Sequence, residues 1–168
     1  MVRWAQVPKM PVPRCQKCSV KLLSSLLVLA ALAMAPSAYA RTCALSIDSN
    51  DRMQFSTATL TVPRDCTQVD LTLRHTGTRP VAVMGHNWVL TRTADFTAVA
   101  QAGMRAKLED NYLPKNDARV IAATPMIGGG QTTRVRFATS KLTRGGDYTF
   151  FCSFPGHWGV MKGKLVFN

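Results

Sequence analysis

The chain carries a thiol, an imidazole and a thioether in one short segment, at Cys152, His157 and Met161. Their spacing is Cys-x4-His-x3-Met, and the residues between them are typical of a loop. A thiolate and a thioether beside an imidazole suit copper, above all when a second histidine completes a trigonal His2Cys set with a weak axial Met. We expect His86, within residues 84–88, to be that second histidine.

The first 40 residues have the layout of a secretory signal. Residues 1–21 hold basic side chains and no acid, residues 22–35 are apolar and uncharged, and Ala38-Tyr39-Ala40 is a small-x-small cleavage site. We therefore expect export of the chain and cleavage after Ala40. An uncut membrane anchor is the alternative, but the apolar run is shorter than the roughly 20 residues needed to span a bilayer.

The remaining segment, residues 41–168, is long enough for one domain, whether translation begins at Met1 or at Met10. The full chain has 21 Lys and Arg against 9 Asp and Glu, a net charge of +12. A basic surface favours acidic partners. The basic residues are scattered, without a basic run or an aromatic stacking pattern, so nucleic acid is a poor candidate partner.

The cysteines divide into three groups. Cys15 and Cys18 form a Cys-x-x-Cys motif inside the signal, and we attribute this spacing to chance. Cys43 and Cys66 flank the first strands of an exported domain, where a disulfide is the default. Cys152 is then the odd thiol in an oxidising compartment, and a bound metal would occupy it.

Alternation of apolar and polar residues predicts strands around residues 69–75, 132–137, 148–152 and 163–167. Turn signals separate them at 76–80, 128–130 and 144–147. This pattern predicts an antiparallel, all-β sandwich or barrel. Apolar spacings of three and four over residues 94–108 predict one short amphipathic helix, inserted across the outside of the sandwich.

Three segments together resemble the azurins, the bacterial type 1 blue copper proteins of the cupredoxin family. They are Met84-Gly85-His86-Asn87-Trp88-Val89-Leu90, then Tyr148 to His157, then Met161-Lys162-Gly163. The resemblance runs from about Cys43 to Asn168 and implies a Greek-key, cupredoxin-like β-sandwich. It also matches Cys43 and Cys66 to the disulfide of that family.

The resemblance implies a role for each site residue. His86, Cys152 and His157 would be strong copper ligands, with Met161 and the carbonyl oxygen of Gly85 as weak ones. Asn87 would link the ligand loops and, with the backbone N–H of Phe154, donate a hydrogen bond towards the Cys152 sulfur. Such hydrogen bonds to the ligands tune the reduction potential of a metal as much as the ligands themselves do. His157 would be the exposed ligand and electron port, inside an apolar patch that includes Met53, Val83, Met84, Met104 and Phe154.

Two positions depart from the azurin pattern at this patch. Arg79 stands where the family usually has Leu, and Trp158 follows the port ligand where a small residue is usual. Both leave the choice of partner open. His75 continues the apolar side of its strand, so we interpret it as a buried, neutral core histidine with a secondary tuning role at most.

The resemblance implies a periplasmic one-electron carrier that cycles Cu(I) and Cu(II), with c-type cytochromes or a periplasmic reductase or dehydrogenase as partners. Zinc is the rival metal, since such a donor set also binds it. A copper delivery or storage protein is a second hypothesis. An enzyme with Cys152 as nucleophile and His157 as base is a third, although no further orienting group is evident.

Overall fold

The computed structural model describes residues 40–168. Residues 1–39 of the predicted signal segment, which include Cys15 and Cys18, lie outside the described residues. Within the described part, no helix is both long and apolar enough to cross a membrane.

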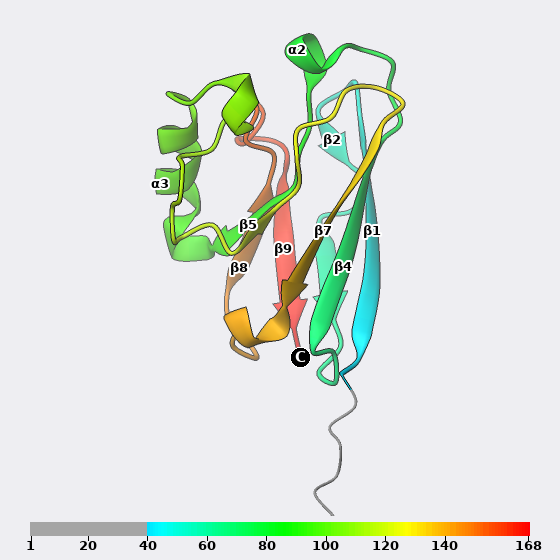
Figure 1. Cartoon of the computed structure of the whole chain (residues 1–168), viewed down its shortest axis with the longest axis vertical. Coiled ribbons are helices and arrows are strands. Elements are labelled where there is room, and N and C mark those ends of the chain that lie inside the picture. Colours follow the sequence, from blue (N-terminus) through cyan, green and yellow to red (C-terminus); the bar gives the residue numbers. More distant parts are fainter. Residues whose placement is uncertain (1–39) are drawn as a thin grey trace, which may run out of the picture. The chain divides into compact units, whose positions relative to one another are not determined.

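Two β-sheets face each other as a sandwich (Figure 1). The first sheet has the order β2-β1-β4-β7, built from β1 (Thr42–Asn50), β2 (Gln54–Phe55), β4 (Gln68–His75) and β7 (Thr132–Ala138). The second has the order β3-β9-β8-β5-β6, built from β3 (Thr59–Val62), β5 (Val89–Arg92), β6 (Ala122–Ala123), β8 (Tyr148–Phe151) and β9 (Lys162–Phe167). The predicted β-sandwich is confirmed.

Strand β4 shows why the alternating pattern was informative. Val69, Leu71, Leu73 and His75 are all buried, while the residues between them are more exposed. The sheets are nevertheless mixed, because β1 runs parallel to β4 and β3 runs parallel to β9. Alternation marks the buried face of a strand but not the direction of its neighbour, so the expected purely antiparallel pairing differs from the structure.

The space between the sheets is filled by a continuous apolar core around Trp88. The indole is fully buried, and the rings of Phe137 and Phe150 stack near it with centroids 6.1 and 6.0 Å away. This core holds the strands whose ends carry the site.

The predicted disulfide joins Cys43 to Cys66 and is confirmed. It links the start of β1 to the turn before β4, with 5.8 Å between the two Cα atoms. Cys152 is the free cysteine of the described residues, and it is buried.

The predicted helix is α3 (Thr93–Gly103), which lies outside the second sheet beside β5 and β8 (Figure 1). Phe96, Val99 and Ala100 pack against Val89 and Phe151. The helix ends at Gly103 rather than at residue 108, and glycine is a poor helix former. The chain returns close to this end, since a Cβ at position 103 would lie 2.2 Å from the Tyr112 carbonyl oxygen.

The remaining helical turns are short. Residues Leu108–Asp110 and Thr139–Lys141 each form a single 3-10 turn. Helix α2 (Val81–Met84) was not predicted from the sequence; it lies at the end of the sandwich away from the C-terminus (Figure 1).

Candidate metal centre

The loop between β8 and β9 brings Cys152, His157 and Met161 together. The Cys152 N–H donates to the Met161 carbonyl oxygen at 3.0 Å, which closes the base of the loop. The Met161 N–H donates to the His157 carbonyl oxygen at 2.8 Å, and Gly156 has a φ of 83°, which lets the chain reverse at little cost. Residues 152–161 thus fold into one compact loop that carries three of the candidate ligands.

His86 approaches this loop from a connection between α2 and β5. It forms an isolated antiparallel bridge with Ile127, in which each backbone N–H donates to the partner's carbonyl oxygen at 2.9 Å. The residue lies outside both elements, and that bridge holds it in place.

The ligand atoms of His86, Cys152 and His157 all lie within 4.8 Å of one another. The Nδ1 atoms of both histidines are 3.7 Å from the Cys152 Sγ, and the Gly85 carbonyl oxygen is 3.9 Å from it. Met161 is completely buried. Of the four side chains, His157 alone keeps some exposure, 4%, against 0% for the others.

Hydrogen bonding orients the ring of His86. Its Nε2 lies 2.8 Å from the Asn50 carbonyl oxygen, and a carbonyl can only accept, so Nε2 carries the proton. The unprotonated Nδ1 then faces the sulfur. Sequence reasoning missed Asn50 because it acts through its backbone carbonyl, which leaves no side-chain signature.

His75 is buried beside His86, and the two rings stack with centroids 4.5 Å apart. The Gly77 N–H donates to His75 Nδ1 at 3.0 Å, so the proton sits on Nε2, which donates to the Met84 carbonyl oxygen at 2.9 Å. Both ring nitrogens therefore have a hydrogen-bond partner.

Asn87 links three segments through its side chain. Its Oδ1 accepts from the Ser153 N–H at 2.8 Å, and its Nδ2 donates to Ser153 Oγ at 2.8 Å and to the Asn111 carbonyl oxygen at 3.3 Å. The Ser153 hydroxyl also donates to the Asn111 carbonyl oxygen at 2.7 Å. Ser153 was singled out only as part of a motif, and Asn111 was missed because its role depends on a contact distant in sequence.

Burial sets the protonation of the metal-free site. Burial lowers the pKa of His86 to about 4 and the pKa of His157 to about 4. Burial also raises the pKa of the Cys152 thiol to about 12, although backbone N–H groups of Asn87 and Phe154 favour the thiolate. At neutral pH both imidazoles are uncharged and ready to donate electron pairs, and the thiol keeps its proton.

This donor set fits copper. A buried thiol, two imidazole Nδ1 atoms and a buried thioether match the His2Cys set with an axial Met that blue-copper sites use. Fold and site together define a β-sandwich protein with one type 1 copper centre, held by His86, Cys152, His157 and Met161.

Comparisons with known proteins agree with this assignment of a copper-binding β-sandwich. Residues 41–168 match the family described as copper binding proteins, plastocyanin/azurin family. The chain is 50% identical to an azurin of Alcaligenes faecalis and 51% identical to azurin-1 of Alcaligenes xylosoxydans xylosoxydans, over 73% of this chain and 96% and 95% of theirs. An azurin structure from Methylomonas sp. strain J matches with a TM-score of 0.73 and 42% identity, over 75% of this chain and 98% of that one.

The chain therefore belongs to the plastocyanin/azurin family of copper-binding proteins. It is an azurin-type one-electron carrier rather than an enzyme, and its partners are other redox proteins.

The predicted patch residues differ in exposure. Met53 is 38% exposed, Val83 53% and Met104 54%, and Arg79 is also exposed. Three further members are half-buried: Met84, Phe154 and Trp158. Val160, inside the ligand loop, is 66% exposed and was missed, although an apolar residue between His157 and Met161 was visible in the sequence.

Proposed function

We propose that this protein carries electrons in the periplasm, and that electrons enter and leave through the His157 ring. The observation that supports this most directly is the small exposure of His157, since the other three ligand side chains are fully buried. Bound copper supplies the one-electron couple Cu(I)/Cu(II). We propose c-type cytochromes, or a periplasmic reductase or dehydrogenase, as its partners.

The protein's contribution is a dry, fixed set of donors. Hydrogen bonds from His86 to Asn50 and from Asn87 to Ser153 hold the ligand segments in place and leave them little freedom to rearrange. Such rigidity favours a carrier over a delivery protein, which must release its metal. A buried thiol with a raised pKa is also a poor nucleophile, which argues against Cys152 as a catalytic residue.

Docking would use the apolar side chains around His157, including exposed Val83 and Met104, with Phe154 stacked on the His157 ring at 4.5 Å between centroids. Basic residues would steer an acidic partner towards this surface. Arg79, exposed within the same predicted patch, would add a local positive charge.

We also propose that residues 1–40 are an export signal, cleaved after Ala40. The family match beginning at residue 41 supports this boundary. The Cys43–Cys66 disulfide supports an oxidising compartment.

The docking proposal is tested by placing a charge in the patch. We expect Val83→Glu to slow electron transfer to a soluble, acidic c-type cytochrome about tenfold, or about 1.4 kcal/mol, because the carboxylate would be desolvated on docking and would repel the acidic partner. Stopped-flow absorbance of the copper-loaded protein measures the rate. Val166→Glu is the matched control, since Val166 is an exposed valine of β9 outside the predicted patch.

Both variants should keep the wild-type visible spectrum. Equal slowing in the two variants, or none in either, would mean that the patch is not the docking surface.

A further inference from the structure

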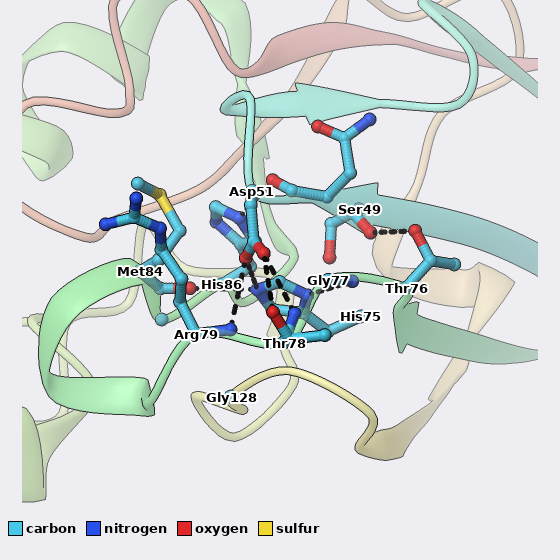
Figure 2. Close-up of polar contacts among 12 residues, drawn as sticks. Ser49, Asp51, His75, Thr76, Gly77, Thr78, Arg79, Met84, His86 and Gly128 are labelled. Atoms are coloured by element: carbon cyan, nitrogen blue, oxygen red, sulfur yellow. Dashed lines mark hydrogen bonds and ion pairs between the residues drawn. The ribbon is translucent and has the colours of Figure 1, made fainter.

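The turn between β1 and β2 lies against the loop that follows β4, and Asp51 joins them (Figure 2). The Asp51 carboxylate accepts a hydrogen bond from the Thr78 N–H at 2.8 Å and a longer one from the Arg79 N–H at 3.4 Å. The Thr78 bond is the main cause that lowers the pKa of Asp51, so the carboxylate is ionised at neutral pH. A charged acceptor makes these bonds stronger than neutral ones.

Gly77 provides the space for this carboxylate. A Cβ at position 77 would lie 2.2 Å from Asp51 Oδ1 and 2.3 Å from its Cγ, closer than real side chains come. The absence of a side chain at Gly77 therefore lets Asp51 reach the backbone of the opposite loop.

Both segments that Asp51 joins support the same metal ligand. On one side, Asn50 precedes Asp51, and its carbonyl oxygen accepts from His86 Nε2–H at 2.8 Å. On the other side, the Gly77 N–H holds His75, whose ring stacks on His86. One support fixes the edge of the His86 ring and the other covers its face.

We propose that Asp51 is a positioning residue of the metal centre. By joining the 50–53 turn to the Gly77–Arg79 loop, its carboxylate keeps the Asn50 carbonyl and the His75 ring in place, and these fix the orientation of His86. Asp51 itself touches no ligand atom. It acts through the two groups that do contact the His86 ring.

The test follows the ring proton of His86 in the Zn(II)-loaded protein, which is diamagnetic and suits proton NMR. We expect the His86 Nε2–H to exchange with solvent about tenfold faster in Asp51→Ala, as when one hydrogen bond no longer holds it. Gly77→Ala should have a similar effect, because its methyl group displaces the carboxylate. Asp51→Asn should be intermediate, since the amide oxygen still accepts a backbone N–H.

Asp48→Ala is the matched control. Asp48 is also at the end of β1, but its carboxylate pairs with Arg74 at 2.8 Å on the exposed side of the sheet. We expect this variant to leave the exchange of the His86 ring proton unchanged. The Cu(II)-loaded forms should follow the same order in their EPR spectra, with Asp51→Ala and Gly77→Ala altered and Asp48→Ala like the wild type.

A thermal unfolding curve separates the positioning role from a purely structural one. Wild-type exchange in Asp51→Ala, with or without a lower melting temperature, would overturn the proposal, as would equal acceleration in Asp48→Ala. If Asp51→Ala does not fold, Gly77→Ala and Asp51→Asn decide by the same exchange measurement.

Discussion

At the scale of single residues, the site combines two neutral imidazoles with a neutral thiol. Histidines whose pKa lies near 4 have no proton to lose at pH 7, whereas a thiol whose pKa is about 12 must lose one to bind a metal. Both imidazoles are therefore already in the form that binds a metal. The Cys152 thiol is the one ligand that must lose a proton first.

This arrangement predicts the proton balance of metal uptake. At pH 7, binding of Zn(II) or Cu(II) to the metal-free protein should release about one proton, from Cys152. Calorimetric titration in two buffers with different heats of ionisation measures that number. Below about pH 4 the two histidines are protonated as well, so more protons should be released and the affinity should fall.

Cys152→Ser is the control for this titration. It should release no proton at pH 7 and give no intense blue absorption with Cu(II), since the thiolate is gone. Release of two or three protons by the wild type at pH 7 would show that the imidazoles start charged, contrary to the effect of their burial.

At the scale of elements, the donors were visible in the sequence but their supports were not. The types and spacing of Cys152, His157 and Met161 predicted the ligand loop, because one short loop brings them together. The Asn50 carbonyl and the Asn111 carbonyl act through backbone atoms from distant segments. No residue pattern marks such contacts, which depend on how the two sheets are placed.

The same limit explains the differences in secondary structure. Apolar spacing placed α3 but not its end at Gly103, since apolar residues at spacings of three and four continue beyond it as far as Leu108. The parallel pairing of β1 with β4 likewise depends on the crossover between sheets. The periodicity of apolar residues within one segment shows neither where a helix ends nor in which direction a strand pairs.

Helix α3 is linked to the ligand loop by an aromatic contact. The ring of Phe96 contacts Trp158 edge-to-face with centroids 5.9 Å apart, and it also contacts Phe151 of β8 edge-to-face at 5.0 Å. Trp158 therefore joins the loop that carries His157 to helix α3.

We expect Trp158→Ala to lower the free energy of unfolding by about 1–2 kcal/mol, less than for a fully buried aromatic because Trp158 is half-buried. Denaturant titration measures this. The visible spectrum of the copper-loaded variant should stay intact, since Trp158 is not a ligand, while its electron-exchange rate with a partner should change. Trp158→Phe should recover most of the stability, and an altered spectrum in Trp158→Ala would contradict the prediction.

At the scale of the whole molecule, the two apolar clusters that hold the elements together do not include the metal ligands. The core around Trp88 contains none of the four ligand side chains, and the second cluster beneath α3 contains none either. The disulfide between Cys43 and Cys66 adds roughly 3 kcal/mol in the chain-entropy model, independently of any metal. The sandwich therefore has its own sources of stability.

Removal of the metal should leave this protein folded, unlike a small zinc domain whose folding energy is its metal-binding energy. Metal bound only by the native state raises stability by RT ln(1 + [L]/Kd), or about 4 kcal/mol when free metal is about a thousandfold above Kd. We expect circular dichroism to show the same strand content in the metal-free and Zn(II)-loaded forms, with one cooperative unfolding transition each. The loaded form should melt at the higher temperature. Cys152→Ser should lose most of that increase in melting temperature, since the thiolate is the strongest donor to the metal. A metal-free protein without a cooperative transition would contradict the prediction, because it would show that the core alone cannot hold the two sheets together.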